Sequence, residues 1–127
     1  MADEYMRQRQ FFGSISGNYH VATSDNNIIA LVAAIPKHTL FIQKIHIEVT
    51  TLAASETWSF QDGAGTPVPF VPSVSAAAIA HFDFDFGPFG APCTEATAFN
   101  LSIAGATGAA GWITWEGYKK LTLASAA

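Results

Sequence analysis

Charged residues are scarce in this sequence. Asp, Glu, Lys and Arg make up 13% of its 127 residues, whereas a soluble domain usually carries about a quarter. Half of the chain is hydrophobic and 13% is aromatic, which excludes intrinsic disorder, because disordered chains are rich in charge and poor in aromatic residues. A surface with so few charges is expected to be partly buried against another chain. The length predicts one domain that spans residues 1–127.

Positive charge is scarcer than negative charge. Six Lys and Arg residues stand against ten Asp and Glu, which gives a formal net charge of −4. Such a surface repels phosphate, so we expect no nucleic-acid partner.

Arginine is absent outside the N-terminal segment, where it alternates with large apolar residues. A segment of this kind can lie on a partner, with aromatic side chains as anchors and arginines in bidentate pairs. Alternatively it is a frayed chain end. We expect residues 1–12 to form an extended arm that contacts a partner. The residues expected to make this contact are Tyr5, Arg7, Arg9, Phe11 and Phe12.

Only one cysteine is present, and long apolar runs are missing. The single Cys93 excludes a disulfide framework within one chain and a four-cysteine zinc site, and we interpret it as a small, semi-buried apolar residue. No apolar run reaches the roughly 18 to 20 residues needed to cross a bilayer. The N-terminus lacks the charged-then-apolar order of a signal peptide. We therefore expect no membrane partner and synthesis in a cytoplasm.

Alternation of apolar and polar residues is the dominant pattern. In residues 39–52, Ile45, Ile47 and Val49 fall on one face, and polar residues fall on the other, as in a strand with one buried face. Further strands are predicted at residues 80–86, 98–103 and 111–118, with weaker ones at 11–16, 19–23, 28–34 and 57–61. Residues 16–18 and 105–111 are among the expected turns. About eight short strands, separated by turn residues and lacking crossover helices, predict an all-β fold. We expect an antiparallel two-sheet jelly-roll sandwich with long loops around residues 62–79 and 87–97.

The 111–118 strand differs because both of its faces are apolar. Trp112 and Tyr118 fall on one face, and Ile113 and Trp115 fall on the other. This predicts a strand covered by the core on one side and by a neighbour on the other. We expect Trp112, Trp115 and Tyr118 to pack between subunits or in the core.

Motifs for catalysis and nucleotide binding are lacking. The serines stand outside a Gly-x-Ser-x-Gly motif, and no glycine loop leads into a helix. We therefore expect no enzymatic activity and no cofactor.

A metal site has one candidate location. His81, Asp83 and Asp85 share one strand face, and His46 with Glu48 forms a similar stripe. If these two strands pair, a cluster of histidines and carboxylates results. The alternative is an ordinary polar stripe that faces solvent or a subunit, and we predict no metal there.

Three tryptophans raise the possibility of sugar binding. Exposed, flat aromatic rings stack on carbohydrates, whereas tryptophan in a strand is usually core or interface. The three residues are Trp58, Trp112 and Trp115.

Several motifs carry a family resemblance over roughly residues 39–120. They are Phe84-Asp85-Phe86-Gly87-Pro88-Phe89-Gly90, the segment 96–105, Gly-Trp-Ile-Thr-Trp-Glu-Gly-Tyr at 111–118, the strand 39–52 and Trp-Ser-Phe-Gln-Asp-Gly at 58–63. This pattern resembles small jelly-roll structural proteins of tailed bacteriophages, in particular the capsid decoration (cement) proteins.

The resemblance implies a structural virion protein without catalytic residues. It would bind the outer capsid surface as a homotrimer at local three-fold positions and stabilise the shell, with the major capsid protein as its partner. Related jelly rolls implied by the same resemblance bind receptors or glycans in phage tails and fibres, which is the alternative function.

Overall fold

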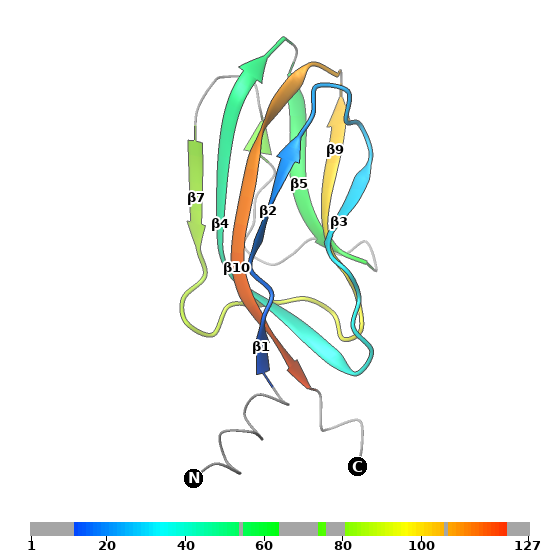
Figure 1. Cartoon of the computed structure of the whole chain (residues 1–127), viewed down its shortest axis with the longest axis vertical. Helices are drawn as coiled ribbons and strands as arrows, with labels where there is room; N and C mark the ends of the chain where they lie inside the picture. Colours follow the sequence, from blue (N-terminus) through cyan, green and yellow to red (C-terminus); the bar gives the residue numbers. More distant parts are fainter. Residues whose placement is uncertain (1–11, 54, 64–73, 76–80, 106, 122–127) are drawn as a thin grey trace.

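The computed structural model describes residues 12–53, 55–63, 74–75, 81–105 and 107–121. These residues form two antiparallel sheets and no helix, so the expected all-β sandwich is confirmed. Figure 1 shows the two longest strands, β4 (His38–Leu52) and β10 (Ala109–Leu121), side by side along the molecule. The other strands are β1 (Phe12–Ser14), β2 (Gly17–Val21), β3 (Ile28–Val32), β5 (Glu56–Asp62), β6 (Val74–Ser75), β7 (His81–Asp85), β8 (Ala91–Pro92) and β9 (Phe99–Gly105).

The strand order is that of a jelly roll. The first sheet runs β2-β10-β4-β7, with β1 beside β10 and β8 beside β4, and the second sheet runs β3-β9-β5-β6. Four pairs are nested, namely β2 with β10, β3 with β9, β4 with β7 and β5 with β6. The chain is therefore one antiparallel ribbon folded on itself. Rolling this ribbon brings β10 onto β4 and β9 onto β5, which is the jelly-roll arrangement.

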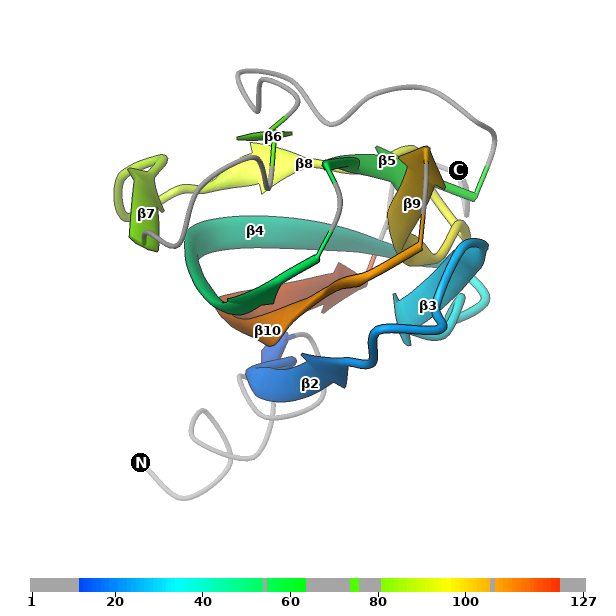
Figure 2. The ribbon, with the colours of Figure 1, turned by 90° about the horizontal axis from the view of Figure 1, so that it is seen from above.

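Apolar residues at alternate positions form the core between the two sheets, which face each other when viewed along the strands (Figure 2). Ile45, Ile47 and Val49 of β4 are buried as the alternation predicts. From the second sheet, Trp58 and Phe60 pack against them in the same cluster, and the Phe60 ring stacks on Phe99 with centroids 5.7 Å apart. Burial of these large side chains is the main source of stability in such a sandwich.

One predicted turn is wrong. Gly17 and Asn18, expected in a turn, begin β2, because β1 and β2 both pair with β10 as one interrupted edge. The interruption lies at residues 15–16, where the Ile15 amide still donates to the Gly117 carbonyl at 3.1 Å.

The glycine-rich segment 105–111 is also shorter as a connection than expected, since β10 already begins at Ala109. Gly111 pairs with β4 so closely that a Cβ atom there would lie 1.9 Å from the Glu48 carbonyl oxygen. Glycine at this position therefore permits strand pairing and is not a sign of a flexible loop.

Part of the sequence prediction lies outside the described residues. This applies to residues 1–11 of the expected arm and to most of the loop expected at 62–79. The second expected long loop, at 87–97, contains the short strand β8.

Candidate functional site

The outer face of the first sheet brings together the two polar stripes recognised in the sequence. β4 and β7 are paired, as the metal hypothesis requires. The facing pairs are Lys44 with Asp85, His46 with Asp83, and Glu48 with His81. β10 adds Thr114 beside His46 and Glu116 beside Lys44.

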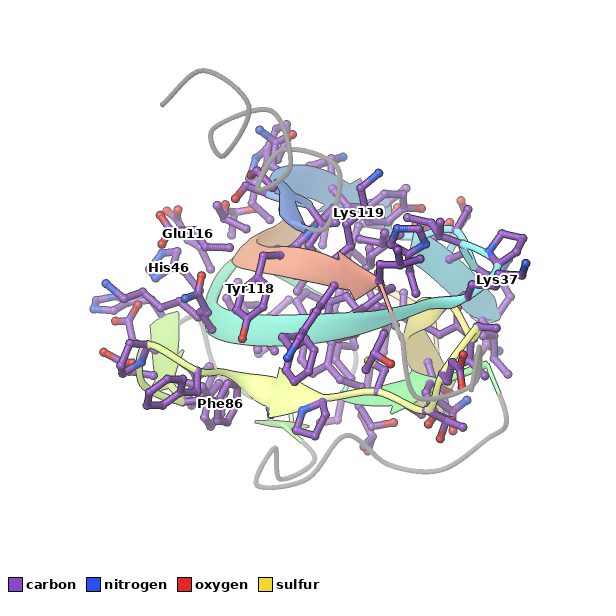
Figure 3. The ribbon with its side chains drawn as sticks, turned by 90° about the horizontal axis from the view of Figure 1, so that it is seen from below. Lys37, His46, Phe86, Glu116, Tyr118 and Lys119 are labelled. Atoms are coloured by element: carbon purple, nitrogen blue, oxygen red, sulfur yellow. The ribbon has the colours of Figure 1, made fainter. Side chains whose placement is uncertain are left out.

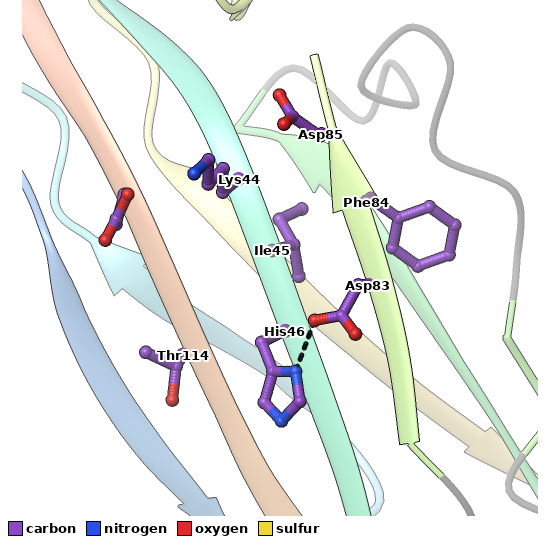
Figure 4. A pocket seen from close by; sticks show the side chains of 8 residues that line it. Lys44, Ile45, His46, Asp83, Phe84, Asp85 and Thr114 are labelled. Atoms are coloured by element: carbon purple, nitrogen blue, oxygen red, sulfur yellow. Dashed lines mark hydrogen bonds and ion pairs between the residues drawn. The ribbon is translucent and has the colours of Figure 1, made fainter. Parts of the chain in front are cut away.

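A shallow hollow of about 280 Å³ is lined by the first two of these pairs and by Thr114 and Glu116 (Figure 4). Within it the His46 ring nitrogen Nδ1 donates to the Asp83 carboxylate oxygen Oδ1 at 2.5 Å. The Asp83 side chain is largely exposed and that of His46 is partly exposed, so this pair adds little stability. In the described part of the chain, no three His, Cys, Asp or Glu side chains are arranged to hold a metal ion. The arrangement fits a polar stripe with Lys44 among its carboxylates.

The three tryptophans have different environments. Trp58 is fully buried, so the hypothesis that it stacks on a sugar is wrong. Trp115 is buried in the core, where its Nε1 donates to the Ile15 carbonyl oxygen at 2.6 Å. Trp112 points outward and is 44% exposed, with its ring 4.8 Å from that of His20. Of the three candidates, Trp112 therefore remains available for a partner or a ligand.

The Tyr118 side chain is partly buried, at the surface of the first sheet. Its ring stacks on Phe41 of β4, with centroids 4.9 Å apart and planes 8° apart. Its hydroxyl group donates to the Phe89 carbonyl oxygen at 2.8 Å. The Tyr118 side chain therefore links β10 to the chain segment between β7 and β8.

The expected arm joins the sandwich close to Tyr118. The backbone of Phe12 pairs with Lys120, and Ser14 pairs with Tyr118. β4 also begins here, since His38 pairs with Leu121. We call this end of the sandwich the arm end; Figure 3 views the molecule from this side. The four arm residues Tyr5, Arg7, Arg9 and Phe11 lie outside the described residues, as does the side chain of Phe12.

Lysines are concentrated at the arm end. Lys37 precedes β4, and Lys119 lies near the end of β10 (Figure 3). Lys120 follows it in the same strand. The aliphatic part of the Lys119 side chain lies over β1: a Cβ atom built at Gly13 would be 2.8 Å from the Lys119 Cε. Exposed Glu95 is the nearby carboxylate on the 94–97 turn, whose Ala96 amide donates to the His38 carbonyl.

Residues 86–90, here named the Phe89 turn, carry the most exposed large apolar side chain in the described part of the chain. Phe89 is 82% exposed. Two glycines set the backbone of this turn, with φ of 81° at Gly87 and 74° at Gly90, a conformation that other residues adopt only with strain. The Gly90 amide donates to the Gly87 carbonyl at 3.2 Å, which closes the turn.

Side chains from three strands hold the Phe89 turn. Asp85 of β7 accepts from the Gly87 amide at 2.9 Å, and Gln43 of β4 donates from Nε2 to the Pro88 carbonyl at 2.7 Å. Tyr118 of β10 supplies the third bond. In the sequence, this segment served only as a motif of the family resemblance, and Phe89 was not identified as a candidate binding residue. The signal was Gly-Pro-Phe-Gly, in which the one large side chain sits inside a tight turn.

Two buried carboxylates were also missed. Glu56 accepts from the Trp58 indole Nε1 at 2.9 Å and from the Ala109 amide at 3.1 Å. Asp62 accepts from the backbone amide and the hydroxyl group of Thr94. Both lie on the same strand face as Trp58 and Phe60, and this parity is the signal that could have identified them as buried.

Cys93 is buried beside Asp62. Burial and, to a lesser extent, the Asp62 charge raise the pKa of its thiol to about 12. The thiol therefore stays protonated and is a poor nucleophile at neutral pH, which agrees with its interpretation as a small apolar residue.

Comparisons with known proteins assign no family. No protein-family model matches the sequence, and no curated protein matches it. Within the residues that the structure describes, no helix has the length and hydrophobicity needed to span a membrane.

Proposed function

We propose that this chain is a structural, non-enzymatic virion protein that binds the outer surface of a phage capsid as a homotrimer and stabilises the shell. Its partner is the major capsid protein. It is made in the host cytoplasm and becomes part of the virion. The jelly-roll sandwich supports this proposal because it is the fold that the family resemblance implies.

The arrangement of the arm end carries the proposal. Residues 1–11 precede Phe12, which is paired with Lys120, so an arm would leave beside three lysines and the Tyr118–Phe41 stack. An extended segment of 11 residues reaches about 35–40 Å. The arm and the arm end would thus form one continuous surface that contacts the shell.

Trp112 supports the homotrimer. The opposite face of its strand is in the core, where Ile113 and Trp115 are buried. An indole that is 44% exposed on a sheet face is typical of residues buried in subunit contacts. In a trimer, each weak shell contact is multiplied through the effective concentration of the other two.

Deletion of residues 1–11 tests the arm. Empty capsid shells are assembled from the major capsid protein whose gene lies nearest to the gene of this chain. Co-sedimentation with these shells measures how strongly the chain binds them. We expect the full chain to bind and the deletion variant to bind at least about tenfold more weakly. Light scattering should give three times the chain mass of 13.5 kDa for both proteins. Unchanged affinity after deletion would refute the arm, and a full chain that does not sediment with shells would refute the function.

Glycan binding is the second candidate, and exposed Trp112 is the observation that favours it. It predicts saturable binding on a glycan array that Trp112→Ser abolishes and that Ile28→Ser, a change at another exposed apolar residue, leaves intact.

A further inference from the structure

We infer that Phe89 is an anchor residue that inserts into an apolar pocket with a polar rim on the shell protein. This inference rests on the proposed function and identifies the surface that makes the contact and the chemistry of its partner.

Exposure is the first argument. Phe89 is 82% exposed, although ten of the chain's residues are Phe and most described ones are at least half-buried in or against the core. A phenyl ring held in water gains free energy when a partner buries it. Aromatic residues that project in this way are typical of the few positions that dominate binding energy.

Rigidity is the second argument. A phenylalanine on a loose loop loses conformational entropy when it binds, whereas one on a fixed turn loses little. Asp85, Gln43 and Tyr118 each bond the backbone of the Phe89 turn, from three different strands. The Phe86 amide adds a fourth bond, to the Gln43 carbonyl at 2.8 Å. The backbone of the turn is thus held in the free protein, and the Phe89 side chain is exposed to solvent.

The position of the turn and the charges around it indicate the kind of partner. Tyr118, which holds the turn, lies two residues from Lys120, where the arm joins the sandwich. Ser14 of β1 and Phe41 of β4 both pair with Tyr118, whose hydroxyl group reaches the Phe89 carbonyl. The turn and the start of the arm therefore lie at the same level of this sheet, where one partner can contact both. The charged side chains beside the turn are of both signs, since Lys44, Asp85 and Glu116 line the hollow next to Gly87 and Pro88. A partner pocket with an apolar floor and a polar rim is complementary to a phenyl ring in these surroundings.

The test compares Phe89→Ser with Ile28→Ser. Ile28 is a matched control, because it is 58% exposed but lies at the start of β3 in the other sheet. Both variants are measured by co-sedimentation with the same capsid shells, beside the unmodified chain. We expect Phe89→Ser to bind at least about tenfold more weakly and Ile28→Ser to bind like the unmodified chain. Neither side chain is in the core, so both variants should unfold at the same urea concentration as the unmodified chain.

A second variant tests the fixed turn itself. Tyr118→Phe keeps the ring on Phe41 and removes the bond to the Phe89 carbonyl. We expect weaker shell binding than the unmodified chain and stronger binding than Phe89→Ser, through a lower association rate.

The outcomes distinguish a failure of the Phe89 anchor from a failure of the proposed function. If the unmodified chain binds shells and Phe89→Ser binds equally well, the anchor is wrong and the proposed function stands. If Phe89→Ser instead lowers the oligomer mass in light scattering, the ring contacts a second copy, and the shell pocket is refuted. If the unmodified chain binds no shell, both proposals fall.

Discussion

Glu56 shows how a single side chain joins distant parts of the sandwich. It is 3% exposed, and its two oxygens accept hydrogen bonds from Trp58 of its own strand and Ala109 of β10. Glu56→Ala leaves both donors buried without a partner, and we expect the free energy of unfolding to fall by about 2–4 kcal/mol. Urea denaturation followed by tryptophan fluorescence measures this change. Exposed Glu48→Ala is the control, with an expected change within about 0.5 kcal/mol; an equally small change for Glu56→Ala would contradict this role.

Cys93 has a thiol whose protonation is linked to folding. Because burial raises its pKa to about 12 in the folded chain from an ordinary value of 9.0, the unfolded chain loses the proton first as the pH rises. The stability that this thiol contributes is therefore complete below pH 9 and disappears between about pH 9 and 12. We expect Ellman's reagent at pH 8 to leave the native thiol unmodified and to modify it rapidly in urea. Rapid modification of the native chain would show that the thiol is accessible.

At the scale of a strand pair, Gly111 sets how closely β10 approaches β4. A Cβ atom at this position would lie 1.9 Å from the Glu48 carbonyl oxygen, and backbone on both strands prevents a local adjustment. We expect Gly111→Ala to destabilise the fold by more than about 3 kcal/mol or to yield insoluble protein. Gly87→Ala is the comparison, because nothing lies within 4 Å of its Cβ position and only its φ of 81° opposes the change. It should cost about 1 kcal/mol. Equal urea midpoints for the two variants would show that the close contact between Gly111 and β4 does not limit the residue at this position.

Strands were predictable where alternation was clear, and turns were not. The residues 39–52 alternate because one face of β4 lies on the core, so the pattern alone predicted both the strand and its buried face. Gly17 was assigned to a turn because glycine usually marks turns, and Gly111 was placed at the start of a strand with no indication of how closely that strand approaches its neighbour. In the structure each faces a strand neighbour: the Trp115 ring lies 2.7 Å from a Cβ built at Gly17. That contact depends on strand partners far away in sequence, which a local pattern does not contain.

The surface of the whole molecule was harder to predict than its core. Sequence alternation placed His46 and Asp83 on outward faces, but only the pairing of β4 with β7 made them neighbours. Phe89 gave no periodic signal, because its exposure results from hydrogen bonds that three strands make to one turn. Trp58 and Trp112 are alike as residues, and the side of the sheet on which each lies decides that one is core and the other surface.

Trp112 connects the composition of the chain to its assembly. With 13% charged residues, the chain has few groups to cover its surface, and an exposed indole adds to the apolar area. If three copies bury this side chain, replacing it with a small polar residue removes the main aromatic contact without opening the core. We expect Trp112→Ser to shift the mass in light scattering from three chains to one, with far-ultraviolet circular dichroism unchanged. Ile28→Ser should remain trimeric, because Ile28 belongs to the other sheet. A Trp112→Ser protein that stays trimeric at micromolar concentration would place the subunit contact on another face.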